Sequence, residues 1–406
     1  MRWSSCCAVF PPSARRHAPY SRRVGRVLFA SFLGALAAAS PATGGVVKVT
    51  STLPEWLAPG GRLVVTGWAA PSERVTLRSQ SGALARVWAG PRGGFRIKAH
   101  VAEAGRKRLS LVAGGIETPL GVVPVRPLRL AAVGDVTFGN GVGRMIGLYG
   151  TRYPWLSVAP VLRRADIALA NLEGAVSTRG TPVPNKEFHF RGPPAALAAA
   201  GRFAGVDVVS LANNHTLDYG RVAFLDTLRY ARRFGIRTVG GGADLARARR
   251  PAVIPLGGIT VAFLGYSDVR PLGFDAGPGR PGTAPAFPEL IAADVRTARE
   301  RADVVVVYFH WGLERTFSPT ARQRSLARVS FAAGAQVVLG SHPHVQQPRE
   351  RFSTRFVAWS LGNFVFGSNS PGTERTGILR LELGRRGVLG HGFRRARIVQ
   401  YQPRLL

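Results

Sequence analysis

Residues 336–344, Gln-Val-Val-Leu-Gly-Ser-His-Pro-His, join an apolar run to two closely spaced histidines. The apolar run predicts a buried strand, and the turn after it directs the imidazoles of His342 and His344 toward one point. Neutral imidazole is the commonest nitrogen ligand of metal ions in proteins, so this turn predicts metal binding. A polar surface loop without a ligand is the alternative for an isolated pair of histidines.

The pair is not isolated, because four upstream strand-like runs also end in polar residues. These runs are 128–133, 166–170, 206–211 and 304–309, and helix-like stretches lie between them at 194–203, 222–234, 291–302 and 320–333. Strands that alternate with helices predict an α/β fold with a largely parallel sheet, whose sites form beyond the carboxyl ends of the strands. The polar residues at those ends are Asp135, Glu173, Asn214, His215 and His310.

The side chains at this sheet edge have the chemistry of a metal centre. Carboxylate oxygens together with imidazole nitrogens suit Mn, Zn or Fe, and five or six such ligands exceed the needs of one tetrahedral ion. A central carboxylate can bridge two ions, and such ions lower the pKa of a bound water, so hydrolysis is the expected reaction class. The candidates at this edge are Asp135, Glu173, Asn214, His215, His310, His342 and His344.

The order of these motifs resembles the CapA family of poly-γ-glutamate capsule biosynthesis, a branch of the calcineurin-like metallophosphoesterases. The resemblance extends over about residues 128–366 and implies a layered α-β-β-α core. The motifs that carry it are Gly134-Asp135, Asn171-Leu172-Glu173, Asn213-Asn214-His215, Asp218, Gly220, His310-Trp311-Gly312-Leu313-Glu314, His342-Pro343-His344 and Ser360-Leu361-Gly362-Asn363-Phe364.

The resemblance also implies a role for each residue. Asp135 and His344 would bind a first metal ion, Glu173 would bridge, and a second ion would be bound by Asn214, His310 and His342. His215 would protonate a leaving group or support an oxyanion, with Asp218 as the other predicted catalytic residue. One departure is Thr137, because the wider superfamily has a histidine at that place, so the sequence leaves one strong ion or a weak pair open.

Asp218 and three further residues have two interpretations each. Asp218 and Glu314 would either orient a ligand histidine or cap a helix. Arg191 and Arg315 are predicted to bind an anionic substrate at the mouth of the site, because a guanidinium grips carboxylate or phosphate with two hydrogen bonds. Solvated surface arginine is the alternative in so arginine-rich a chain.

The amino-terminal part of the chain predicts export and a second domain. Residues 1–42 contain six arginines, no acid and an apolar run at 27–39, which is typical of a secretory signal peptide. Residues 43–126 hold short strand-like runs separated by turns, which predict an immunoglobulin-like β-sandwich. Residues 127–406 form the predicted CapA-like domain. An extracellular, periplasmic or envelope location follows, and both cysteines, Cys6 and Cys7, would leave with the signal.

The net charge of +33 indicates which class of molecule the protein binds. It favours a polyanion, and since no arginine-rich helix or row of stacking aromatics points to nucleic acid, an anionic envelope polymer such as poly-γ-glutamate is expected. Membrane synthase components are a further expected partner. Three functions stay open: a metal-dependent hydrolase of that polymer, a non-catalytic polymer-binding or synthase-assembly factor, and a general phosphodiesterase.

Overall fold

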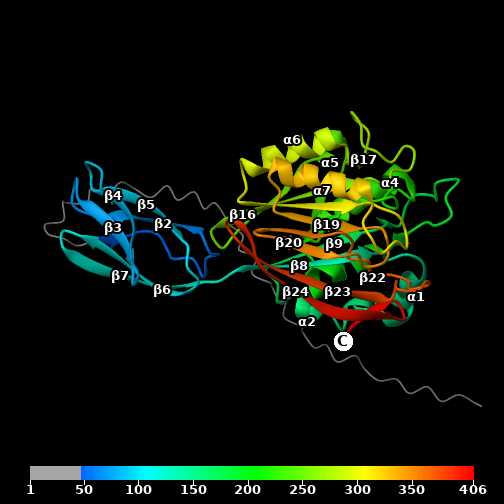
Figure 1. Cartoon of the computed structure of the whole chain (residues 1–406), viewed down its shortest axis with the longest axis horizontal. Helices are drawn as coiled ribbons and strands as arrows, with labels where there is room; N and C mark the ends of the chain where they lie inside the picture. The colour runs from blue at the N-terminus through cyan, green and yellow to red at the C-terminus, as the bar shows by residue number, and fades with distance from the viewer. Residues whose placement is uncertain (1–46) are drawn as a thin grey trace, which may run out of the picture. The chain divides into compact units, whose positions relative to one another are not determined.

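The computed structural model describes residues 47–406, which form a mixed α/β fold (Figure 1). This confirms the fold class predicted from the alternating apolar runs. The predicted signal peptide at residues 1–42 lies outside the described residues. In the part of the chain that the structure describes, no helix has the length and apolar character needed to cross a membrane.

Residues 47–125 form strands and loops in two antiparallel sheets with a core of their own, which includes Val65, Leu77 and Leu111. The immunoglobulin-like assignment and the boundaries 43–126 and 127–406 stay predictions. One sheet contains β1 (Lys48–Val49), β2 (Gly61–Trp68) and β5 (Gly94–Val101), and the other contains β4 (Gly82–Trp88), β3 (Arg74–Ser79), β6 (Gly105–Ala113) and β7 (Ile116–Val125).

Two larger sheets form the rest of the fold. The first has eight strands in the order β13 (Arg237–Val239), β12 (Val208–Ser210), β9 (Ile167–Leu172), β8 (Leu128–Val136), β23 (Arg375–Gly384), β24 (Gly387–Val399) and β25 (Gln402–Leu405), with β22 (Asn363–Val365) also paired to β8. The second has six, in the order β15 (Ala252–Leu256), β16 (Ile259–Ser267), β18 (Val304–His310), β19 (Val337–Ser341), β21 (Arg355–Ala358) and β20 (Arg349–Phe352).

The helices cover the outer faces of these two sheets. One apolar core joins the first sheet to α1 (Asn140–Tyr149), α2 (Ala159–Leu162), α3 (Pro194–Ala199) and α4 (Gly220–Arg233). Another joins the second sheet to α5 (Leu245–Ala248), α6 (Pro288–Arg299) and α7 (Ala321–Ala333), and the last two lie side by side in Figure 1. Short elements complete the chain: η1 (Tyr153–Trp155), η2 (Ala200–Ala204), and the strand pairs β10 (Ala175–Val176) with β11 (Arg191–Gly192) and β14 (Gly241–Gly242) with β17 (Gly282–Thr283).

A third core lies between the two sheets and is built by alternation along the strands. Leu128, Leu130 and Ala132 of β8 face it, whereas Ala131 and Val133 face the helices on the other side. Because successive side chains of a strand point to opposite faces, an almost wholly apolar strand is what burial on both faces requires. This explains why the predicted runs read as continuous apolar segments.

The carboxyl ends of parallel strands from both sheets meet at one place. The Tyr308 hydroxyl of β18 donates to the Val133 carbonyl of β8 at 2.9 Å, which ties the sheets together next to Asp135. Gly134 permits the close approach of β22 there, because a Cβ on it would lie 1.7 Å from the Gly362 carbonyl oxygen. The Asp135 N–H donates to that carbonyl at 2.9 Å. The predicted sheet edge is therefore one compact place in three dimensions.

Candidate metal centre

Three buried side chains from three strand ends form what we call the inner group: Asp135, Glu173 and His310. One potential ligand atom from each lies within 4.8 Å of the others. Asp135 lies near the end of β8, Glu173 follows β9, and His310 is the last residue of β18. All three are fully buried. Asp135 and Glu173 come together because β8 and β9 run parallel, and His310 joins them from the other sheet.

Amide side chains hold the inner group in place. The Asn171 Nδ2 donates to Asp135 Oδ1 at 2.8 Å and lies 3.3 Å from His310 Nδ1. The opposite ring nitrogen, His310 Nε2, lies 2.7 Å from Asn214 Oδ1, which places this predicted ligand beside the inner group. Asn213 donates to the Leu172 carbonyl at 2.8 Å and so positions the turn that carries Asn214. These contacts fix the orientations of the His310 ring and the Asp135 carboxylate. In metal sites, side chains that hydrogen-bond the ligands have the same effect.

Glu173 is the side chain whose surroundings most require a cation. Both of its carboxylate oxygens are buried without a hydrogen-bond partner among the described residues. Burial raises the pKa of the Glu173 carboxyl well above its usual range, and the nearby Asp135 raises it further. A buried carboxylate without partners is costly, and a bound cation removes that cost. The residues present therefore fit a divalent metal ion.

The Asp135 carboxyl is ionised, although it is as fully buried as the Glu173 carboxyl. Burial raises its pKa, but a hydrogen bond to His344 and the positive charge of that imidazole outweigh this and hold the pKa of Asp135 below its usual range. Burial and the neighbouring His342 lower the pKa of His310 well below its usual range, so that imidazole is neutral. An anionic oxygen beside a neutral imidazole is the donor state that a metal ion needs.

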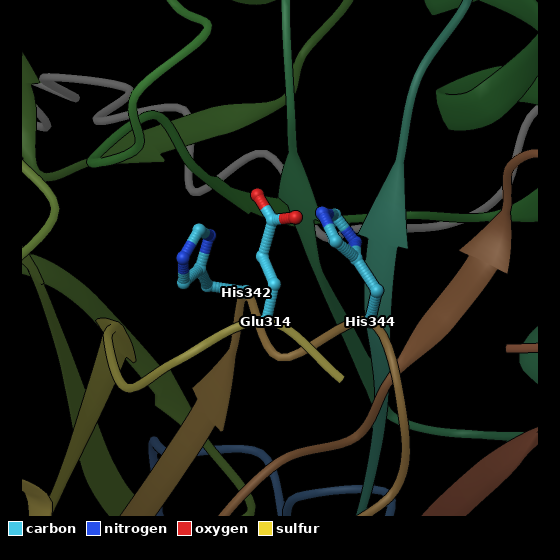
Figure 2. A group of neighbouring side chains, drawn as sticks. All are labelled: Glu314, His342 and His344. Carbon is cyan, nitrogen blue, oxygen red and sulfur yellow. The ribbon is translucent and has the colours of Figure 1, made fainter. Parts of the chain in front are cut away.

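Glu314, His342 and His344 form what we call the outer group, shown in Figure 2. One potential ligand atom from each again lies within 4.8 Å of the others. His342 and His344 have positive φ angles of 95° and 59°, a backbone conformation that residues other than glycine rarely adopt. Such a strained conformation persists only where the surrounding structure stabilises it, and it is frequent at functional sites.

The two histidines of the outer group differ in their ionisation. Burial and the neighbouring His344 lower the pKa of His342 to about 3, so its imidazole is neutral. Burial also lowers the pKa of His344, but the carboxylates of Glu173 and Asp135 raise it to about 9. Its Nδ1 lies 2.8 Å from Asn363 Oδ1 and 3.5 Å from Asp135 Oδ2. His344 thus links the outer group to the inner one.

His215 and Asp218 form a pair beside the inner group. His215 Nδ1 lies 2.7 Å from Asp218 Oδ2, and its Nε2 lies 3.8 Å from Glu173 Oε1. Asp218 also accepts the Phe190 N–H at 2.7 Å and the Lys186 ammonium. Helix α4 begins after Tyr219 and has no side-chain cap, so Asp218 orients a histidine instead of capping a helix. Burial lowers the pKa of His215, against the influence of Asp218.

A cavity of about 440 Å³ opens beside these groups. Its lining includes His215, Glu314, Arg315, His344 and the aromatic rings of Phe188, Phe190, Phe366 and Tyr401. Arg315 is therefore part of the cavity lining, and its predicted role in binding an anionic substrate stays a prediction. Arg191 is not part of the lining: its Nη1 donates to the carbonyls of Arg179 and Gly180, and its guanidinium stacks 4.1 Å from the Tyr219 ring centre.

Sequence reasoning assigned no role to three residues that the structure places here. Arg144 of α1 lines the cavity, Asn363 contacts His344, and Lys186 donates to the Asn214 carbonyl and lies 3.1 Å from His215 Nδ1. Lys186 carried one signal, because it is one of only four lysines in a chain with 55 basic residues. Arg144 carried none, since it is one of many arginines on a helix surface.

Comparisons with known proteins give one family and a consistent set of relatives. A family model described as bacterial capsule synthesis protein PGA_cap matches residues 129–368. The PGA biosynthesis protein CapA of Bacillus subtilis is 33% identical over 68% of this chain and 73% of its own length. The capsule biosynthesis protein CapA of Bacillus anthracis is 29% identical over 68% of this chain and 70% of its own.

Among solved structures, the chain is similar to a 5'-nucleotidase precursor from Thermus thermophilus. The identity is 14%, the match covers 69% of this chain and 54% of that one, and the TM-score is 0.40.

Proposed function

Because this chain belongs to the CapA-like family of bacterial capsule synthesis proteins, we propose that it is an exported, metal-dependent hydrolase of poly-γ-glutamate. It would process this anionic polymer during capsule synthesis. The observation that carries the proposal is the pair of buried Glu173 oxygens without hydrogen-bond partners, which lie beside the imidazoles of His215 and His310 and a second carboxylate. A site built only for stability would not leave a carboxylate in that state.

Six side chains would hold the metal, one or two ions of Mn, Zn or Fe. When bound, such ions supply Lewis acidity and an activated water. Oxygen and nitrogen donors without thiolate suit these metals. The inner group and Asn214 would take the deeper position, and His342 and His344 would complete the set, with His344 at the cavity. The proposed ligands are Asp135, Glu173, Asn214, His310, His342 and His344.

His215 would handle the proton of the leaving group. Its Nδ1 is engaged by Asp218, so the proton available to a substrate would be held at Nε2, which is near Glu173 and the cavity. Burial, which lowers the pKa of His215, keeps the ring ready to accept and return a proton. Asp218 and Lys186 keep the ring in its orientation.

Charge and sequence support the proposed location and partners. The basic chain, with a net charge of +33, favours an anionic envelope polymer as partner, and its relatives are named for capsule synthesis, which favours work beside membrane synthase components. The signal-like residues 1–42 favour export. The core would have the layered metallophosphoesterase-like architecture, and the strands of residues 47–125 would form an immunoglobulin-like spacer or docking module.

A non-catalytic role is the second candidate, and Thr137 is the observation that favours it. Thr137 lines the cavity two residues after Asp135 and offers a neutral hydroxyl instead of an imidazole. A weaker metal site of this kind could bind polymer, or help a synthase to assemble, without hydrolysing anything. General phosphodiester hydrolysis is the other catalytic candidate, because two-metal sites also support that reaction.

One assay separates these candidates. Purified protein would be loaded with Mn, Zn or Fe and incubated with poly-γ-glutamate and, separately, with a generic phosphodiester. Shortening of the polymer by a loaded sample, but not after chelation, is the expected result. Cleavage of the phosphodiester alone would select the phosphodiesterase, and polymer binding without cleavage would select the non-catalytic factor.

A further inference from the structure

We propose that Glu314 is a metal ligand and that the outer group of Glu314, His342 and His344 forms a second ion position at the cavity. The inference rests on the proposed metal dependence, adds a ligand to it and commits to two ion positions. In the sequence, Glu314 had two other interpretations, as a helix cap or as a residue that orients a histidine. The next helix, α7, begins at Ala321 with Thr320 as its cap, so Glu314 caps nothing there.

The geometry of the outer group is that of three converging ligands. Figure 2 shows the Glu314 carboxylate lying between the imidazoles of His342 and His344 in this view, and the nearest ligand atoms of all three lie within 4.8 Å of one another. Ligand atoms that surround an ion at about 2.0–2.2 Å are separated by distances of this order. A carboxylate and two imidazoles suit Zn or Mn.

The position of Glu314 is fixed by the backbone although its side chain is exposed. Glu314 belongs to the loop after β18, and the two histidines belong to the loop after β19. The Arg315 N–H donates to the Pro343 carbonyl at 2.8 Å, which joins the two loops between the residues concerned. Arg315 has a positive φ of 57°, a strained conformation that this contact holds in place.

Each histidine of the outer group has a ring nitrogen that can face an ion. His342 is only 6% exposed, and its Nδ1 is buried with no hydrogen-bond partner among the described residues. Its ring is packed between those of His310 and His344, with centroid distances of 4.7 and 5.7 Å. A buried polar atom held this firmly without a partner calls for a ligand. Asn363 engages Nδ1 of His344, which leaves Nε2 of that ring for an ion.

The surroundings of the outer group indicate an open ion position. Glu314 makes no ion pair in the part of the chain that the structure describes, although Arg315 is its neighbour and several other acids of this protein pair with arginine. Glu314 and His344 both line the cavity. Three protein ligands with the remaining place open to a cavity are typical of catalytic ions and leave room for an oxygen atom of a carboxylate or phosphoryl substrate.

Metal stoichiometry of the full chain tests the inference. Isothermal titration with Mn²⁺, with elemental analysis in parallel, is expected to give two ions per chain for the wild type. Glu314→Gln should retain one tight ion and bind the other at least about tenfold more weakly. Loss of a side chain that only hydrogen-bonds a metal ligand already weakens metal binding by about that factor. Glu289→Gln, an exposed glutamate on α6, is the matched control and should leave both ions unchanged.

Electron paramagnetic resonance of the Mn²⁺-loaded protein gives a second readout. Because the rings of His310 and His342 are adjacent, two ions would lie close enough for magnetic coupling, and Glu314→Gln should leave the spectrum of an isolated ion. A wild type that binds one ion, unaffected by Glu314→Gln, overturns this inference and leaves the inner position standing. A wild type that binds two ions with no change in Glu314→Gln also overturns it. A wild type that binds none overturns the proposed metal dependence itself.

Discussion

The inner and outer groups hold similar ligands but are built in different ways. The inner group projects from strand ends, is fully buried, and is oriented by Asn171 and Asn214. The outer group lies on two loops, has strained backbone at both histidines, and includes the exposed Glu314. The difference teaches that the sheets position the deep part of the site, whereas a few loop contacts position the part that meets a substrate. Four predictions test this division.

The largest effect is expected from the double substitution His310→Ala and His342→Ala. It removes His310 from the inner group and His342 from the outer group, so each ion position loses a buried imidazole ligand. Elemental analysis of protein purified without chelator should show Mn, Zn or Fe in the wild type and none in the variant. A circular dichroism spectrum like that of the wild type would establish that the variant is folded.

The control for this experiment is His100→Ala, an exposed histidine on β5. It should retain the wild-type metal content. A wild type that stays metal-free when each of these ions is supplied would remove the metal claim for both groups.

The second prediction separates binding from catalysis. His215 contacts Asp218 and lies 3.8 Å from Glu173. We expect it to transfer a proton and not to bind a metal ion. His215→Ala should retain metal content and reduce turnover by about 100- to 10,000-fold on whichever substrate the wild type cleaves. Elemental analysis and a turnover assay on the same preparation measure both. Loss of metal in this variant would mean that His215 is a ligand of the inner group.

The closeness of the inner-group side chains could be predicted from the sequence because it depends on where single strands end. Each ligand follows an apolar run, and the carboxyl ends of parallel strands share one edge. The observed strands β8, β9, β18 and β19 agree with the predicted runs to within a few residues, and helix α7 begins at the predicted place because Thr320 and Gln323 form a capping box.

The outer group and the cavity were harder to predict because they depend on distances between loops. Arg191 and Arg315 looked equivalent in the sequence, but two carbonyls and Tyr219 hold Arg191 outside the cavity lining. Glu314 could not be assigned without the contact between its loop and the histidine turn. The antiparallel strands β23 to β25 were not predicted either, since no site motif follows them.

The third prediction compares the two carboxylates by stability without metal. Glu173 is buried beside Asp135 without hydrogen-bond partners, whereas Glu314 is exposed. In the presence of chelator, Glu173→Gln should raise the Tm by roughly 2–4 °C, since about 1 kcal/mol of buried charge repulsion is removed. Glu314→Gln should leave that Tm unchanged. Thermal melts followed by circular dichroism measure both, and a lower Tm for Glu173→Gln would contradict the idea of an unpartnered carboxylate.

The smallest effect concerns the arginines at the mouth of the site. Arg315 and Arg144 line the cavity and are exposed, so each would contribute about 0.5–1 kcal/mol to binding an anionic chain. Arg315→Gln should weaken binding of poly-γ-glutamate by about two- to fivefold and reduce its salt dependence. Arg191→Gln is the matched control, because its guanidinium is already occupied by carbonyls and Tyr219. Fluorescence anisotropy at several salt concentrations compares the two variants, and equal losses of affinity would place the anion-binding surface outside the cavity.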